Sequence, residues 1–268
     1  MKNLTVSYDI NINKKGAGCG EFKAVYITDL HDVIWNDDPS YLPGLIKAEE
    51  PDIIFCGGDM IAALPGEENE NAFTFMKQML DIAPVYFGLG NHEFRSRLYK
   101  ETYGDMYEKF MQPLLDDGMI LLENEKTDID INGAALTVYG LEIPRKNYTR
   151  LKSVPFTTDE MRELLGRPSK NRAGILLAHN PRYHKTYERW GADLILCGHY
   201  HGGIMRLGKH MGLVSPGFEP LAKFSHGHFE TNGKHLVISA GLGEHTIPVR
   251  INNPRELVIL NIKVNQEK

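Results

Sequence analysis

Short hydrophobic runs recur along the chain, and each is followed by polar residues whose side chains can bind a metal or act in catalysis. Five runs of aliphatic, aromatic and β-branched residues cover positions 24–27, 52–56, 85–87, 174–178 and 193–197. Continuous apolar runs of this length predict strands that are covered on both faces. Between the runs, hydrophobic residues recur at helical spacing, as in Phe73, Met76 and Leu80. The alternation predicts an α/β fold with helices packed on the sheets.

Two Asn-Gly pairs predict β-hairpin turns. Asn132-Gly133 and Asn232-Gly233 each lie between two short runs of strand-forming residues. Residues 258–264 alternate between hydrophobic and polar side chains, which is typical of a strand with one exposed face. The mixture of βα units and hairpins predicts a two-sheet α/β sandwich in a single domain, residues 1–268. A domain boundary near residue 155 is the alternative.

Composition narrows the class of protein. The chain has 268 residues, of which 42% are hydrophobic, so it can bury a core. Its formal net charge is −5, so it has no overall positive field that would attract nucleic acid or anionic lipid. Three scattered cysteines argue against disulfides and for a reducing compartment. Residues 1–10 lack a signal-type apolar stretch, and the apolar runs are too short to span a bilayer. We expect a cytoplasmic protein that binds no structured nucleic acid and has no membrane span.

Side chains that bind metals follow all five hydrophobic runs. The segments are Asp29-Leu30-His31, Gly57-Gly58-Asp59, Gly90-Asn91-His92-Glu93, His179-Asn180 and Gly198-His199-Tyr200-His201. Ligand sites in open α/β sheets lie beyond the carboxyl ends of the strands, so these segments should converge. Each segment alone has a simpler explanation, such as a cap, a turn or a core histidine. Their joint occurrence at five strand ends indicates a metal site.

In order, composition and spacing, the five segments resemble the metal-site blocks of the calcineurin-like metallophosphoesterases. The resemblance runs from residue 29 to residue 201. It implies a four-layer α/β/β/α sandwich, with two mixed β-sheets flanked by helices and two metal ions at one end of the sheets. The implied ligands are Asp29, His31 and His201 for one ion, Asn91, His179 and His199 for the other, and Asp59 as a bridge between them.

The resemblance also implies a reaction. Carboxylate, amide and imidazole ligands without thiolate suit Mn or Fe, with Zn as an alternative. Two such ions share a bridging hydroxide that attacks phosphorus, which implies metal-dependent hydrolysis of a phosphodiester or pyrophosphate bond in a small molecule. Asp59 is then catalytic as the bridging ligand. His92 stays off the metals and assists the leaving group, with a purely structural role in its loop as the alternative.

The second block separates the chain from one branch of this superfamily. Ser/Thr protein phosphatases have Gly-Asp-x-Val-Asp-Arg-Gly there, whereas this chain continues from Gly58-Asp59 with Met-Ile-Ala-Ala. The stretches 236–243, 248–250 and 253–257 resemble a bacterial subgroup of small phosphoesterases instead. A phosphomonoesterase with the same mechanism is the alternative activity, and a non-catalytic metal-binding scaffold is the alternative from another class.

Several residues keep open interpretations. His226 and His228 either approach the site or lie on a solvent-facing strand. Trp35 either forms an apolar wall for a substrate or packs in the core. The tripeptide Asn147-Tyr148-Thr149 matches the glycosylation pattern, which has no meaning in a cytoplasmic chain.

Overall fold

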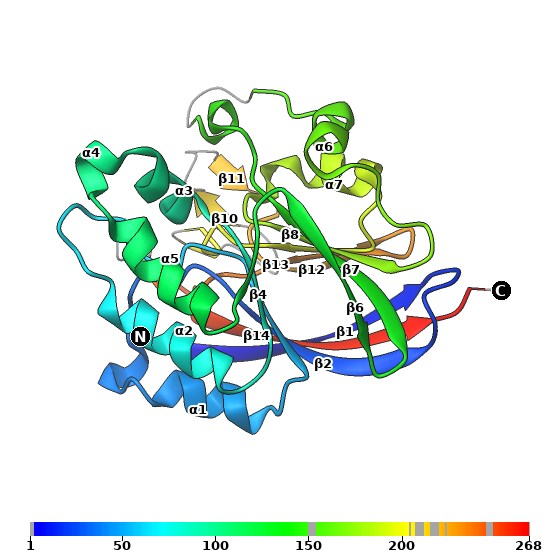
Figure 1. The fold of residues 1–268 in the computed structure, drawn as a ribbon, viewed down its shortest axis with the longest axis horizontal. Coiled ribbons are helices and arrows are strands. Elements are labelled where there is room, and N and C mark those ends of the chain that lie inside the picture. Colours follow the sequence, from blue (N-terminus) through cyan, green and yellow to red (C-terminus); the bar gives the residue numbers. More distant parts are fainter. Residues whose placement is uncertain are drawn as a thin grey trace.

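Two six-stranded β-sheets lie face to face at the centre of the fold (Figure 1). This computed structural model describes residues 3–149, 154–203, 205–206, 212–214, 220–222, 224–244 and 249–267. The first sheet has the strand order β1 (Asn3–Asn13), β14 (Arg255–Asn265), β2 (Gly20–Ile27), β3 (Ile53–Cys56), β4 (Val85–Gly88) and β5 (Ile120–Leu122). The second has the order β12 (Gly227–Thr231), β13 (Lys234–Ile238), β9 (Leu194–Cys197), β8 (Ala173–Ala178), β7 (Ala134–Leu141) and β6 (Glu125–Ile131). A separate pair joins β10 (Gly212–Val214) and β11 (Pro220–Ala222).

Helices cover the outer face of each sheet (Figure 1). The first sheet is covered by α1 (Tyr41–Ala48), α2 (Glu70–Leu80) and α5 (Met106–Asp116). The second is covered by α6 (Thr158–Leu165) and α7 (His184–Trp190). The shorter elements are α3 (Asn91–Leu98), α4 (Lys100–Tyr103) and the 3-10 helices η1 (Trp35–Asp37), η2 (Arg145–Tyr148) and η3 (Pro181–Tyr183).

Three hydrophobic clusters separate four layers. In β2, Val25 and Ile27 belong to the cluster under the helices of the first sheet, whereas Ala24 and Tyr26 belong to the cluster between the sheets. This division follows from the alternation of side chains along a strand. A third cluster lies between the second sheet and its helices. The predicted four-layer α/β/β/α sandwich is confirmed.

The strands that precede the candidate ligands run parallel within each sheet. The pairs β2–β3, β3–β4 and β8–β9 are all parallel, so their carboxyl ends lie at one edge of each sheet. The two edges meet, because Nδ1 of His179 after β8 lies 2.8 Å from the carbonyl oxygen of Gly57 after β3. The five expected strands and their common edge are therefore present.

The two Asn-Gly turns close hairpins as predicted. Asn132 and Gly133 have φ of 49° and 89° between β6 and β7, and Asn232 and Gly233 have φ of 53° and 71° between β12 and β13. Two successive positive φ values are the geometry that favours Asn-Gly in hairpins.

At the edge of the first sheet, β1 pairs in parallel with β14 from Asn3 to Asn13. The hydrophobic pattern of neither strand predicts this pairing.

Trp35 packs in the core. Its side chain is 1% exposed, and its indole N–H donates to the carbonyl oxygen of Leu242 at 2.6 Å. This burial favours the core interpretation of the tryptophan over the substrate-wall interpretation. Among the described residues, no helix combines the length and the apolar character needed to cross a membrane.

Candidate metal centre

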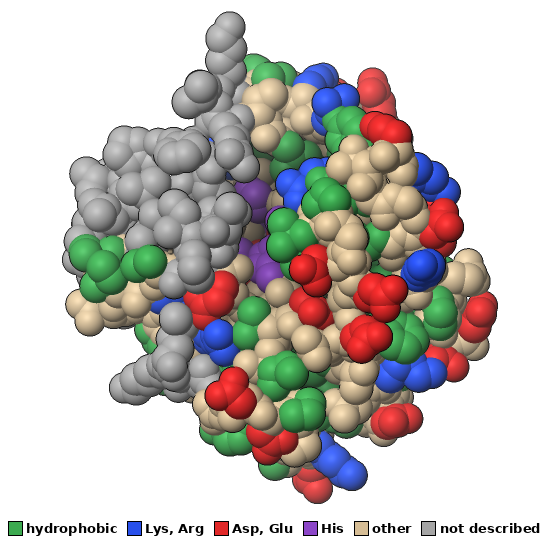
Figure 2. Space-filling model, turned by 90° about the vertical axis from the view of Figure 1, so that its left-hand side faces the viewer, with side chains coloured by type: hydrophobic (Ala, Val, Ile, Leu, Met, Phe, Trp, Pro, Cys, Tyr) green, Lys and Arg blue, Asp and Glu red, His purple; other side chains and the backbone are tan. Residues whose placement is uncertain are grey.

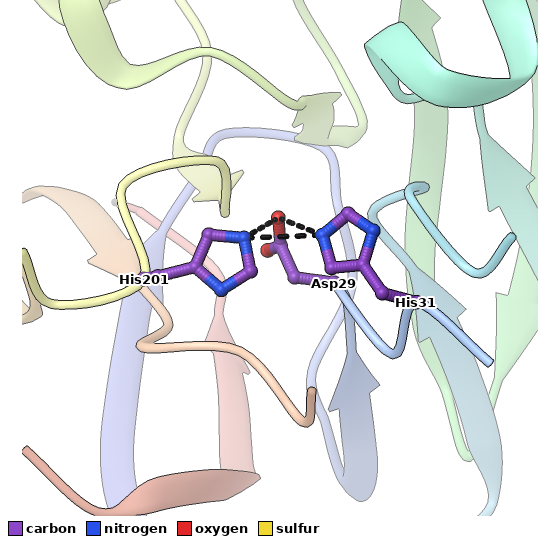
Figure 3. A group of neighbouring side chains, drawn as sticks. All are labelled: Asp29, His31 and His201. Atoms are coloured by element: carbon purple, nitrogen blue, oxygen red, sulfur yellow. Dashed lines mark hydrogen bonds and ion pairs between the residues drawn. The ribbon is translucent and has the colours of Figure 1, made fainter. Parts of the chain in front are cut away.

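Asp29, His31 and His201 converge at the end of β2 (Figure 3). Nε2 of His31 lies 3.1 Å from Nε2 of His201, and Nε2 of His201 lies 3.2 Å from Oδ1 of Asp29. Nε2 of His31 is 4.0 Å from the same oxygen. Ligands bound about 2.0–2.2 Å from one cation lie roughly 3–3.5 Å from each other, so this triangle has the size that a shared ion requires.

Asp59, His179 and His199 form a second group. One ligand atom from each lies within 4.8 Å of the others, and Nε2 of His179 is 3.1 Å from Oδ2 of Asp59. Nδ1 of His179 faces the carbonyl oxygen of Gly57 at 2.8 Å, which directs Nε2 toward the carboxylate. Asn91, the first residue of α3, has a buried Oδ1 with no hydrogen-bond partner among the described residues. An orphaned buried acceptor at this place fits an amide ligand.

Asp59 lies between the groups. Its Oδ2 is 4.0 Å from Nε2 of His31 and 3.1 Å from Nε2 of His179, so one carboxylate reaches both sets of histidines. Nε2 of His92 is 3.9 Å from the same oxygen, and Nδ1 of His92 lies 2.6 Å from the carbonyl oxygen of Ala62. The structure thus brings together seven of the predicted site residues, Asp29, His31, Asp59, His92, His179, His199 and His201. For Asn91 it shows the orphaned Oδ1 at the start of α3.

Five of these residues have left-handed backbone conformations. The list of φ values is 54° for Asp29, 49° for His31, 55° for Asp59, 65° for His199 and 48° for His201. Such conformations cost of order 1–3 kcal/mol each for residues other than Gly, and they cluster at functional sites. In a loop of this kind His199 and His201 escape the alternation of a strand, and they reach neighbouring positions of one cluster.

Two glycines permit the close approach of the site loops. A Cβ at Gly58, where φ is 85°, would lie 2.0 Å from the backbone nitrogen of Gly90. A Cβ at Gly198 would lie 2.1 Å from Oδ2 of Asp29. Any side chain at these positions would push the ligand-bearing loops apart, which explains Gly next to ligand residues.

Glu93 organises the loop that carries Asp59. Its carboxylate is fully buried and accepts hydrogen bonds from the backbone N–H groups of Asp59 and Met60 at 2.8 Å, Gly90 at 3.1 Å and Ile61 at 3.3 Å. Burial, reinforced by the charge of Asp59, raises the pKa of Glu93 to about 7. The motif Gly90-Asn91-His92-Glu93 by itself predicts no role for Glu93. The available signal was its place three residues after Gly90, from which a Glu side chain can reach back and accept the backbone N–H at the start of the helix.

Arg250 supports the first group from a distant part of the chain. Its guanidinium contacts the carbonyl oxygens of Ala240 at 2.8 Å and Gly243 at 2.5 Å, and Nη2 lies 3.2 Å from Nδ1 of His201. The N–H of Gly243 donates in turn to the carbonyl oxygen of Asp29 at 2.6 Å. Arg250 therefore links the loops that carry two candidate ligands, although Pro248 of the same motif lies outside the described residues.

The electrostatic field of the centre favours a cation. Burial lowers the pKa of His179, but Asp59 and Asp29 raise it more strongly, to about 10. Burial, followed by repulsion from His179, lowers the pKa of His199 to about 3. For Asp29, burial raises the pKa, but the imidazoles of His201 and His179 lower it further, below its usual value. Two buried carboxylates this close together create a negative potential that divalent ions satisfy.

The histidines near the second hairpin, His228 and His235, form a separate chain of polar contacts. Nε2 of His228 is 3.0 Å from Nδ1 of His235, and Nε2 of His235 is 2.9 Å from the carbonyl oxygen of Asn11. This chain joins β12 and β13 to β1, so His228 has a structural place between the sheets. His226 is buried, and its Nδ1 lies 2.9 Å from Oγ of Ser225.

The fold and the clustered metal-binding side chains are those of a metal-dependent phosphoesterase, and comparison with known proteins gives the family. A sequence model described as "Calcineurin-like phosphoesterase" matches residues 22–203, more than half of the chain. The chain belongs to the calcineurin-like phosphoesterase family and is a metal-dependent phosphoester hydrolase by class. The family predicted from the five blocks is confirmed.

Bacterial proteins are among the relatives. The chain is 26% identical to the uncharacterized protein YpbG of Bacillus subtilis, with 88% of this chain and 79% of that protein covered. It is 27% identical to the metallophosphoesterase Cj0846 of Campylobacter jejuni, with 91% of this chain and 59% of that protein covered. It is 24% identical to the phosphodiesterase YaeI of Escherichia coli, with 90% of this chain and 82% of that protein covered.

Proposed function

We propose that this protein hydrolyses a phosphodiester or pyrophosphate bond in a small molecule, with two metal ions held by the clustered side chains. The observation that carries the proposal is the position of Asp59, whose Oδ2 reaches His31 on one side and His179 on the other. The proposed ligands are Asp29, His31 and His201 for one ion, Asn91, His179 and His199 for the second, and Asp59 for both. The similarity to the phosphodiesterase YaeI supports a diester over a monoester.

When bound, the ions would supply an activated water and neutralise charge on the phosphoryl oxygens. The oxygen and nitrogen donors without thiolate favour Mn or Fe, with Zn as the alternative. The chain itself orients the donors: Gly57 fixes the ring of His179, and the loop glycines let Asp29 and Asp59 approach. Among the described residues, Figure 2 shows histidine side chains in a hollow of the surface, where a small phosphate ester can enter.

His92 is the proposed general acid. Its Nδ1 lies 2.6 Å from the carbonyl oxygen of Ala62, which leaves Nε2 on the side of Asp59. A protonated Nε2 at that place gives its proton to a departing alkoxide, a contribution of about 10²–10⁴-fold. His92→Ala is expected to keep its metal content and to lose most kcat on esters with poor leaving groups. Unchanged turnover on such esters would remove this role.

The activity is tested with purified protein and added Mn²⁺. Bis-p-nitrophenyl phosphate should be hydrolysed faster than p-nitrophenyl phosphate. A clear preference for the monoester would favour the phosphomonoesterase alternative. Bound metal without hydrolysis of either compound, or of a nucleoside pyrophosphate, would favour the non-catalytic scaffold.

Asp59→Asn tests the bridge, because it keeps the shape of the side chain and removes its charge. Elemental analysis should show that both ions are lost together, whereas the matched variant Asp81→Asn, at an exposed position after α2, should keep them. Loss of one ion alone would contradict a bridging role.

The proposal takes residues 1–268 as one domain. It also places the protein in the cytoplasm, which the free thiols of Cys56 and Cys197 support.

A further inference from the structure

An aromatic residue outside the five blocks lies against the centre. Tyr148 is the last residue of η2, and its ring packs edge-on against His199, with 6.2 Å between ring centroids and an interplanar angle of 75°. The same ring stacks on Phe94 in α3 at 6.2 Å and 27°. Phe94 follows His92 by two residues in the chain. Tyr148 therefore lies where the start of α3 meets the loop of His199, at the edge of the metal centre.

A buried polar network fixes the backbone next to Tyr148. The side chain of Asn147 is fully buried, and its Nδ2 donates to the carbonyl oxygens of Val154 at 3.1 Å and Pro155 at 3.3 Å. The hydroxyl of Tyr183 lies 3.1 Å from the carbonyl oxygen of Asn147. Asn147 in its glycosylation-like tripeptide is thus a structural residue, and its bonds hold Tyr148 in one place.

The hydroxyl of Tyr148 takes no part in this network. Tyr148 is only partly buried, and its hydroxyl makes no hydrogen bond with any residue of the described chain. Tyr183 and Tyr187, by contrast, direct their hydroxyls to backbone carbonyl oxygens, Tyr187 to that of Asn180 at 2.9 Å. A phenol that is held rigidly beside a metal centre and has no partner in the fold is a donor suited to a ligand.

We propose that Tyr148 contacts the substrate and donates a hydrogen bond to a phosphoryl oxygen beside His199, an inference that rests on the proposed phosphoesterase activity. The phosphoryl group is anionic, and hydrogen bonds to charged acceptors are the stronger ones. Tyr148 is therefore a substrate-binding residue that the metal-site blocks do not contain.

Tyr148→Phe tests this role, because it keeps the ring contacts with Phe94 and His199 and removes only the hydroxyl. We expect an unchanged manganese content and an unchanged unfolding midpoint. The kcat/KM for bis-p-nitrophenyl phosphate should fall about 10- to 100-fold, the loss expected for one hydrogen bond to a charged acceptor. Calorimetry with the manganese-loaded protein should show a matching loss of affinity for inorganic phosphate. The control is Tyr41→Phe, at an exposed tyrosine that begins α1.

The outcomes separate this inference from the proposed function. Wild-type kcat/KM and wild-type phosphate affinity in Tyr148→Phe would overturn the role of the hydroxyl while the phosphoesterase activity stands. A wild-type protein that binds manganese but hydrolyses no phosphoester would overturn the proposed function. In that case phosphate calorimetry still decides on Tyr148, since equal affinities in wild type and variant would overturn its contact with the phosphoryl group.

Discussion

The carboxylate of Glu93 gives the sharpest test of how the site loop is held. Replacement by Gln keeps the length of the side chain and one oxygen, but converts the other oxygen into an NH₂ group, which is a donor. Each oxygen of Glu93 now accepts two backbone N–H groups, Oε2 from Asp59 and Gly90 and Oε1 from Met60 and Ile61. In Glu93→Gln, two of the four N–H groups therefore lose their acceptor and face a second donor.

The cost follows from the burial of these groups. A buried N–H without an acceptor costs about 1–3 kcal/mol, so two of them should lower the free energy of unfolding by about 2–6 kcal/mol. This is a large share of the roughly 5–15 kcal/mol that stabilises a domain. The loss is not recovered by rearrangement, because Glu93 is 0% exposed and water has no access to the orphaned donors.

Urea denaturation followed by circular dichroism measures the effect at a pH above 8, where Glu93 is ionised, with a chelator present so that metal binding does not add to stability. The matched variant is Glu101→Gln, at an exposed position in α4, which should stay within about 0.5 kcal/mol of the wild type. Without the chelator, Glu93→Gln should also bind less manganese, because the same carboxylate positions the backbone of Asp59. A loss of stability below about 1 kcal/mol would refute the reasoning, since even one orphaned N–H costs that much.

Two further predictions concern a glycine and a histidine. Gly58→Ala should lower both the unfolding midpoint and the metal content, because its Cβ would lie 2.0 Å from the backbone nitrogen of Gly90. The control is Gly66→Ala, which has nearly the same φ of 86° but open space around it and should keep its metal. Equal metal content in the two variants would contradict the steric argument. Burial, and after it the charge of His235, lowers the pKa of His228 in the folded protein below its usual value. The unfolded chain therefore binds the proton of His228 more tightly than the folded protein does. As a result, the free energy of unfolding should fall as the pH drops through the usual pKa of histidine. Urea titrations at pH 5 and pH 7.5 should show a smaller pH dependence for His228→Gln than for the wild type, and an equal dependence would exclude His228 as its source.

The common edge of the two sheets could be predicted because it depends on local signals. Apolar runs such as residues 53–56 form strands wherever they are covered, and Gly57-Gly58 directly after the run marks the strand end. Parallel strands bring such ends together without further information. The pairing of β1 with β14 could not be predicted, since it joins residues about 250 positions apart and each strand alone is compatible with several neighbours.

The sequence does not predict helix α3, for a different reason. Its sequence, Asn91–Leu98, is mostly charged and polar and carries no apolar stripe, so hydrophobic periodicity does not detect it. Its first turn is fixed instead by hydrogen bonds to other loops, such as the one from the N–H of His92 to Oδ1 of Asp59 at 2.7 Å. The helix therefore depends on the site as much as the site depends on the helix.

The sequence shows which residues can be metal ligands, whereas the position of each ligand depends on contacts made by the whole fold. Few side chains bind cations, so Asp, Asn and His at strand ends are recognisable one by one. The left-handed φ of these residues has no local signature, because Asp and His also adopt extended and helical conformations. Contacts from distant segments hold the strained loops, as when the N–H of His199 donates to the carboxylate of Asp29, 170 residues earlier, at 3.0 Å. The geometry of the centre is thus a property of the assembled fold, and substitutions at supporting positions such as Arg250 should disturb it without removing any ligand.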